Sequence, residues 1–273
     1  MTETSRPRGR PKAFHDKSEQ NTVQALDRAL GLLEILAGHS GLTLSELAQR
    51  SDQAVATVFR ALATLQARGM VEVEEPGQLW HIGGGAFRIG SAFLRRTKVV
   101  ERARGPMEAL MRDTGETANL GVEVGDEVLF LAQVETHEAI RAFFPPGTKG
   151  PMHVSGIGKA LLAWSSPEKL AGIVARRGLA RFTELSLITV DALKADLAIT
   201  RARGFAIDDQ ERAPGMRCIA APIFNAYAEP VAGLSVSGPA FRVALQNADR
   251  IGRLVRNAAD RVTEATGGMQ PAL

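Results

Sequence analysis

The chain of 273 residues has room for two domains, and its composition, 45% hydrophobic and 23% charged, is that of a globular protein rather than a disordered or fibrous one. The net charge of +3 is too small to indicate nucleic-acid binding by itself, the one cysteine, Cys218, excludes an intrachain disulfide, and no apolar run reaches membrane-spanning length. The N-terminus is polar and basic, without the apolar segment of a secretory signal. We therefore expect a cytoplasmic protein with neither a metal site nor a cofactor.

A basic arm precedes the first regular pattern. Residues 1–20 are polar and are predicted to be disordered. They contain Arg8-Gly9-Arg10-Pro11, which resembles an AT-hook, a slim extended segment that lies in the narrow minor groove of A·T-rich DNA. Arg8 and Arg10 are the predicted contacts, because a narrow minor groove has a negative potential that attracts arginine. A solubilising tail is the alternative, but the position just ahead of a DNA-binding pattern favours the hook.

Residues 21–83 have the pattern of a winged helix-turn-helix. A capping box, Thr43 to Glu46, opens a second helix over 44–50, and Ser51 or Asp52 is expected to cap a third helix over 53–68. The strands 71–74 and 79–82 around a Pro-Gly turn form the wing, whereas a generic three-helix bundle would lack this hairpin. The apolar face of the first helix is predicted to be Val23, Leu26, Leu30, Leu33 and Leu36.

The third helix of such a domain enters the major groove and reads base edges with its N-terminal half. Gln pairs with adenine, Arg pairs with guanine, and the methyl group of Thr contacts thymine. The predicted base contacts are Gln53, Ala56, Thr57 and Arg60. The predicted phosphate contacts are Ser45, Gln78 and Trp80.

The rest of the chain is predicted to form a linker helix over residues 84–104, a second domain over 105–268 and a short tail over 269–273. Strands are predicted over 117–124, 128–135, 139–143, 205–208, 217–224 and 231–237. Helices are predicted over 107–114, 155–164, 167–177, 190–203 and 241–266. Helices before, between and after the strands predict an α+β domain with a mostly antiparallel sheet.

Small polar residues interrupt the apolar strands of the second domain. Ser235 and Ser237 face the same side of one strand, and Asp208 and Cys218 lie on the strands nearby. Buried hydroxyls need partners, which are either the neighbouring backbone or a small polar ligand. Four such residues on adjoining strands favour a pocket.

Five ordered segments resemble the IclR family of bacterial transcriptional regulators. They are residues 114–117 (TGET), 151–160 (PMHVSGIGKA), 203–209 (RGFAIDD), 215–222 (GMRCIAAP) and 235–238 (SVSG). The resemblance implies a GAF-like effector-binding domain and a dimer or dimer of dimers that binds palindromic operator DNA. The family usually carries Ser-Thr before the arginine of the third helix, and Ala56 departs from this pattern.

The resemblance is greatest to the glyoxylate-responsive members and implies a site for a small 2-oxo acid, with an aromatic or sugar acid as the alternative. Ile157 replaces a smaller residue of some glyoxylate sensors and would narrow the site. The implied effector-binding residues are Gly156, Ile157, Asp208, Met216, Cys218, Ser235 and Ser237. Among these, Gly156 to Gly158 open a predicted helix whose free N–H groups favour an anion.

Two other classes of protein are compatible with parts of the sequence. Cys218, His153 and Asp208 are the residue types of a cysteine-dependent enzyme acting on a small carbonyl acid. A lone cysteine in an apolar strand is usually a small buried hydrophobe, and an enzyme has no need of a DNA-binding module, so we expect no catalytic activity. A dimerisation module without a ligand is the third hypothesis.

Overall fold

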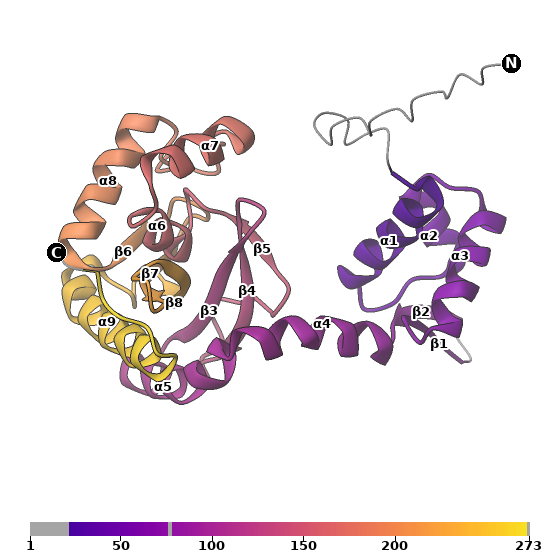
Figure 1. Cartoon of the computed structure of the whole chain (residues 1–273), viewed down its shortest axis with the longest axis horizontal. Coiled ribbons are helices and arrows are strands. Elements are labelled where there is room, and N and C mark those ends of the chain that lie inside the picture. The colour runs from indigo at the N-terminus through magenta and orange to yellow at the C-terminus, as the bar shows by residue number, and fades with distance from the viewer. Residues whose placement is uncertain (1–21, 76–77, 272–273) are drawn as a thin grey trace, which may run out of the picture. The chain divides into compact units, whose positions relative to one another are not determined.

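The computed structural model describes residues 22–75 and 78–271, so the predicted contacts Arg8 and Arg10 and the Pro-Gly turn of the wing lie outside the described residues. The chain divides into two compact units, Met1–Phe93 and Leu94–Leu273 (Figure 1). None of the helices in the described parts of the chain is both long and apolar enough to cross a membrane.

The first unit is a helix-turn-helix followed by a hairpin. Its elements are α1 (Gln24–Ala37), α2 (Leu44–Ser51), α3 (Val55–Ala67), β1 (Val71–Glu74) and β2 (Leu79–Ile82), and α4 (Gly84–Thr97) follows. The predicted capping box is confirmed, since Thr43 accepts from the backbone N–H of Glu46 and the Glu46 carboxylate accepts from the N–H of Thr43. β1 and β2 pair antiparallel, as a wing requires.

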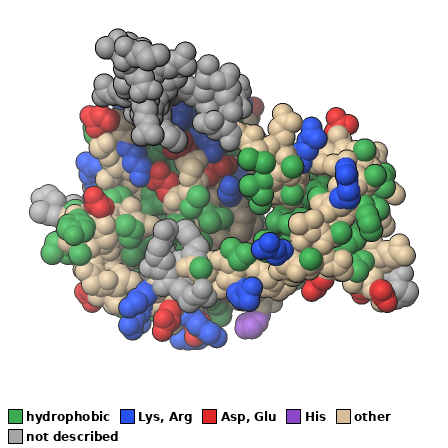
Figure 2. Space-filling view, turned by 45° about the vertical axis from the view of Figure 1, so that its right-hand side comes forward, with side chains coloured by type: hydrophobic (Ala, Val, Ile, Leu, Met, Phe, Trp, Pro, Cys, Tyr) green, Lys and Arg blue, Asp and Glu red, His purple; other side chains and the backbone are tan. Residues whose placement is uncertain are grey.

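Two details of the first unit correct the sequence prediction. α3 begins at Val55 after Ala54, which has no capping side chain, because Ser51 is still in α2 and Asp52 ends that helix in the left-handed conformation. The core holds Leu32 and Leu36 from the second half of α1, whereas Val23, Leu26 and Leu30 are 65%, 58% and 49% exposed. Hydrophobic side chains therefore reach the surface of the unit (Figure 2).

The second unit is built on a six-stranded sheet in the order β5-β4-β3-β8-β7-β6, and every pairing is antiparallel. The α+β prediction is confirmed. The strands are β3 (Thr117–Val124), β4 (Glu127–Val134), β5 (Lys149–Pro151), β6 (Ala206–Asp209), β7 (Met216–Phe224) and β8 (Pro230–Pro239). The strand predicted over 139–143 is wrong: these residues are irregular, and β5 occupies the edge beside β4 instead.

Helices cover both faces of this sheet. α5 (Val99–Thr114) and α9 (Ala248–Ala265) lie against one face, and α6 (Gly156–Leu162) lies against the other, with α7 (Pro167–Arg177) and α8 (Val190–Arg203) beyond it (Figure 1). The predicted linker helix is two helices, because Lys98 adopts a left-handed conformation between α4 and α5. The closing helix is shorter than predicted and follows a 3-10 turn, Leu245–Asn247.

Candidate functional site

The antiparallel register places the polar residues of the second unit in two rows across the sheet. Asp208 pairs with Cys218, Cys218 with Ser237 and Ser237 with Thr117. The next row on the same face runs from Ala220 through Ser235 and Asn119 to Gln133. Because paired residues point to the same side, five strands contribute polar side chains to one patch of the sheet.

A buried amide connects the two serines. Asn119 is fully buried, and its Nδ2 lies 3.3 Å from Ser237 Oγ and 3.5 Å from Ser235 Oγ. Gln133 Nε2 donates to Asn119 Oδ1 at 3.0 Å, which orients the amide. Both serine oxygens accept from Asn119, and both hydroxyl groups also bond to the Cys218 thiol, so a ligand competes with the sulfur for their hydrogens. The sequence prediction missed Asn119, although a polar residue inside an apolar strand was a usable signal.

α6 closes the patch into a small cavity of about 20 Å³. Its opening residue Gly156 packs directly on Cys218: a Cβ at Gly156 would lie 2.6 Å from the thiol sulfur. The Ile157 side chain fills the space above Gly121 and Gly233, two glycines of the sheet. The lining residues are Phe130, Phe144, Gly150, Ser155, Gly156, Ile157, Asp208, Arg212, Cys218, Ser235 and Ser237.

Six of the seven predicted effector-binding residues therefore line one cavity. Met216, the seventh, lies on the same face of β7 as Cys218 but at the start of the strand, opposite Pro239, and it is not among the lining residues. The N–H of Gly158 is directed to Ser155 Oγ, 3.4 Å away, so it is not a free donor as predicted. Arg212 and the stacked pair Phe130 and Phe144 also line the cavity and were not predicted.

Asp208 is the acidic group of the cavity. Its Oδ1 accepts from the N–H of Glu211 at 2.9 Å, and its side chain is buried. Burial raises the pKa of Asp208 to about 6, although the backbone N–H and nearby Lys159 and Arg212 oppose this shift. The carboxyl group is therefore able to exchange a proton near neutral pH.

The cysteine is unsuited to nucleophilic catalysis. Burial raises the pKa of the Cys218 thiol to about 11, whereas a reactive cysteine needs a lowered pKa. His153, the candidate base, does not line this cavity: its Nε2 bonds to the carbonyl oxygen of Ala180 at 3.0 Å, and burial lowers its pKa. The chain does not assemble the three residues into a catalytic group.

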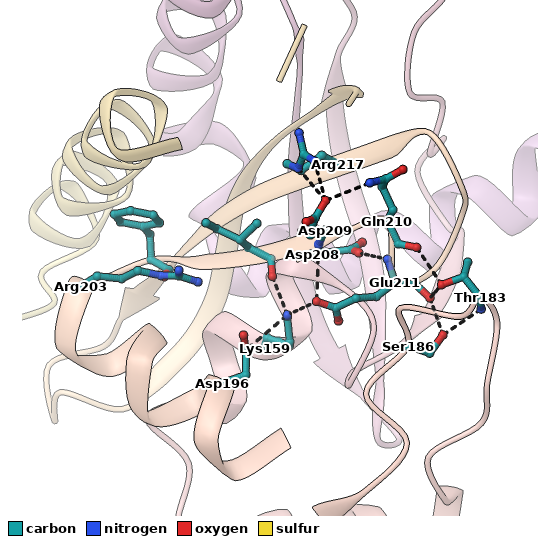
Figure 3. A network of polar contacts seen from close by, with 12 residues as sticks. Lys159, Thr183, Ser186, Asp196, Arg203, Asp208, Asp209, Gln210, Glu211 and Arg217 are labelled. Carbon is teal, nitrogen blue, oxygen red and sulfur yellow. Dashed lines mark hydrogen bonds and ion pairs between the residues drawn. The ribbon is translucent and has the colours of Figure 1, made fainter. Parts of the chain in front are cut away.

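A buried ion-pair network lies next to Asp208 (Figure 3). Lys159 of α6 has no exposed surface, and its ammonium group lies 2.5 Å from Glu211 Oε1 and 3.1 Å from Asp196 Oδ2. It also donates to the carbonyl oxygen of Ile207 at 2.5 Å. The network joins α6, α8 and the segment after β6, so that the element carrying Asp208 is fixed to two helices.

The predicted DNA-contacting residues lie in the first unit. Ala56 and Arg60 are exposed on α3, and Thr57 is half-buried beside them. Gln53 precedes α3, and its Oε1 is buried without a hydrogen-bond partner among the described residues, so this oxygen does not face solvent. Ser45 and Gln78 are exposed and line one open hollow. Trp80 also borders this hollow, but it is only 6% exposed and belongs to the core.

Comparisons with known proteins agree with this architecture. A model described as the IclR helix-turn-helix domain matches residues 25–75, and one described as the bacterial transcriptional regulator IclR C-terminal domain matches residues 91–264. The HTH-type transcriptional regulator BhcR of Paracoccus denitrificans is 52% identical over 97% of this chain and 94% of its own. The transcriptional repressor IclR of Escherichia coli is 40% identical over 96% and 97%.

A solved structure matches both units as well. An IclR homolog from Microbacterium hydrocarbonoxydans, complexed with 4-hydroxybenzoate, has a TM-score of 0.77 and 25% sequence identity. The match covers 88% of this chain and 98% of that one.

Proposed function

The chain belongs to the IclR family of bacterial transcriptional regulators, and we propose that it binds operator DNA with an affinity set by glyoxylate in the cavity of its second unit. The relatives are regulators rather than enzymes, and so is this protein. The observation that carries the glyoxylate proposal is that Asp208, Cys218, Ser235 and Ser237 line one small cavity.

The donors of this cavity suit a carboxylate. Ser235 and Ser237 accept from Asn119 and can turn their hydrogens from the Cys218 sulfur to a ligand, and Ile157 lines the cavity at the opening turn of α6. Asp208 accepts a hydrogen bond from a hydroxyl group when it is ionised. A hydrated aldehyde beside a carboxylate meets both demands, and hydrated glyoxylate is such a molecule.

Size favours the same ligand. The cavity has about 20 Å³, little more than the space that one water molecule needs. Ile157 and the stacked rings of Phe130 and Phe144, whose centroids are 4.9 Å apart, occupy the volume that an aromatic ring would need. The smallest 2-oxo acid therefore disturbs the lining least. An aromatic acid, as in the 4-hydroxybenzoate complex of the Microbacterium homolog, is the second candidate.

On the DNA side, the exposed N-terminal half of α3 supports major-groove reading by Ala56, Thr57 and Arg60, with Gln53 at its start and with Ser45 and Gln78 near the phosphates. Arg8 and Arg10 would add minor-groove contacts. The exposed apolar residues of α1 support a homodimer, or a dimer of dimers, on a palindromic operator in the cytoplasm. Glyoxylate then shifts the population between states that differ in operator affinity. The controlled genes encode enzymes that metabolise glyoxylate.

The test combines calorimetry with an operator mobility shift, using glyoxylate, pyruvate, oxalate and 4-hydroxybenzoate. We expect glyoxylate to bind most tightly and to change the operator complex, and Asp208→Ala and Ser237→Ala to remove both effects. Ser165→Ala is the matched control, since that hydroxyl bonds to the carbonyl oxygen of Leu161 and lies outside the cavity. Unaltered responses in Asp208→Ala and Ser237→Ala would refute the site, and tighter binding of 4-hydroxybenzoate would favour the second candidate.

A further inference from the structure

Arg212 is the cationic side chain of the cavity lining among the described residues. It is half-buried after β6, and its guanidinium carbon lies 5.9 Å from the centroid of the Phe182 ring. On its other side, a guanidinium nitrogen packs against Gly150 so closely that a Cβ there would lie 2.7 Å from it. An aromatic ring and a glycine thus hold the group in place without satisfying its hydrogen bonds.

Other arginines of this unit with buried surface have polar partners. The half-buried Arg203 donates to the carbonyl oxygen of Phe205 at 2.6 Å, the half-buried Arg242 donates to Glu116 at 3.0 Å, and the buried Arg217 donates to Asp209 at 2.6 Å. The guanidinium of Arg212 has neither a direct ion pair nor a hydrogen bond within the described residues, although its charge acts on Asp208 at longer range. A guanidinium carries five N–H donors in a fork that matches a carboxylate, so an unpaired one at a cavity wall is a vacant anion position.

No other group near the cavity supplies this charge among the residues that the structure describes. Lys159 is already surrounded by Glu211, Asp196 and the carbonyl oxygen of Ile207. α6 is two turns long, and Ser155 already accepts from the N–H of Gly158 at its N-terminus. A carboxylate that enters the cavity also meets the acidic Asp208. Without a cation, its desolvation and this repulsion would be uncompensated.

We propose that Arg212 is the counter-ion of the effector carboxylate and the residue that restricts the site to small monoacids. The inference rests on the proposed function, since it requires the cavity to take a small acid. Beside an ionised Asp208 and with Arg212 present, a bound monoacid leaves one uncompensated negative charge, whereas a diacid would leave two. A second carboxylate would face Asp208 without a partner, and a neutral aldehyde would leave Arg212 unpaired.

The test compares glyoxylate with glycolaldehyde, a neutral molecule with the same number of carbon atoms, by calorimetry on the full chain. Arg212→Met keeps an unbranched apolar stem and removes the charged end, and Arg212→Lys keeps the charge and loses the fork. Arg250→Met is the control, because Arg250 is an exposed arginine of α9 that does not line the cavity. Thermal melting without ligand reports whether each variant folds.

We expect Arg212→Met to weaken glyoxylate binding by about 10- to 100-fold, as the loss of a charged hydrogen bond does, while glycolaldehyde binding stays as it was. Arg212→Lys should recover part of the affinity, and Arg250→Met should change nothing. Unchanged glyoxylate affinity in Arg212→Met would overturn the proposal. An equal loss for both ligands would overturn it too, because it would show a role in shape rather than in charge.

Other outcomes of the same experiment would refute the proposed function rather than the role of Arg212. If wild type binds pyruvate or oxalate instead of glyoxylate, glyoxylate is the wrong effector, and the same three variants test Arg212 with the acid that binds. If wild type binds none of these acids, both the site and the role of Arg212 are refuted. Retained binding to wild type with an unaffected Arg212→Met variant refutes only Arg212.

Discussion

Lys159 Nζ and Glu211 Oε1 lie 2.5 Å apart in the interior of the second unit, and the lysine has no exposed surface. Asp196 reaches the same ammonium group from α8 at 3.1 Å. Two carboxylates thus share one cation, and Glu211 bonds through its backbone N–H to Asp208, the acidic group of the cavity. The charges of the network hold Glu211 in place, and the backbone N–H of Glu211 positions Asp208.

Removing the cation of this network should lower the free energy of unfolding. Lys159→Met leaves Glu211 and Asp196 without compensation, and breaking a buried pair from one side costs about 3–5 kcal/mol. Urea denaturation measures the free energy of unfolding. Lys169→Met is the matched control, because Lys169 pairs with Glu123 at 2.6 Å but is 44% exposed, and an exposed pair contributes about 1 kcal/mol or less. Similar losses in both variants would contradict the structural role of the network.

Two raised pKa values predict how stability depends on pH. Burial raises the pKa of Asp208 to about 6 and that of Glu211 to about 7, above the unfolded values of about 4. At pH values between the unfolded and the folded pKa, the folded chain binds more protons than the unfolded chain. The free energy of unfolding therefore falls as pH rises from about 4 to about 7. The loss is on the order of 1.4 kcal/mol for each pH unit that separates a folded from an unfolded pKa, and relaxation of the buried groups reduces it.

The check is urea denaturation of wild type and Glu211→Gln at pH 5 and pH 7.5. We expect wild type to lose more stability over this interval than the variant does, because the glutamine does not titrate. Asp208→Asn should flatten the dependence in the same way. Parallel curves for wild type and both variants would show that neither carboxyl group titrates in this range.

The exposed apolar side chains of α1 predict self-association. Leu26 is 58% exposed, and covering a leucine in a partner copy is worth about 1.5–3 kcal/mol. Leu26→Glu should therefore weaken self-association and operator affinity about tenfold or more, measured by light scattering and mobility shift. Gln24→Glu places the same charge elsewhere on α1, where the side chain is also exposed, and should have little effect. Equal behaviour of the two variants would mean that this face stays in contact with water.

Much of the fold could be predicted because its boundaries are encoded locally. α7 and α8 have the predicted bounds, since Ser166 and Thr189 cap their N-termini and Gly178 and Gly204 end them with positive φ. The strand predicted over 139–143 failed because an apolar run does not say whether the edge of a sheet is free, and β5 takes that edge. The buried face of α1 depends likewise on what packs against it.

Only some residues of the candidate site could be predicted from the sequence. Ser235, Ser237, Cys218 and Asp208 interrupt apolar strands, and this pattern is visible in the sequence. Arg212 stands in a polar segment, where an arginine is unremarkable, and only the fold brings it to the cavity wall. Its significance comes from the absence of a partner among the described residues, which no sequence pattern can show.

Arg60 gives the sharpest test of the first unit. It is exposed on α3, one turn after Ala56 on the same face of the helix, and a bidentate contact of arginine with guanine is worth about 1–3 kcal/mol. Arg60→Ala should weaken operator binding by about this amount and change binding to unrelated DNA much less, as measured by mobility shift at fixed salt. Arg68→Ala is the control, since Arg68 is also exposed but caps the C-terminal end of α3. An equal loss on operator and unrelated DNA would show that Arg60 contacts phosphate rather than a base.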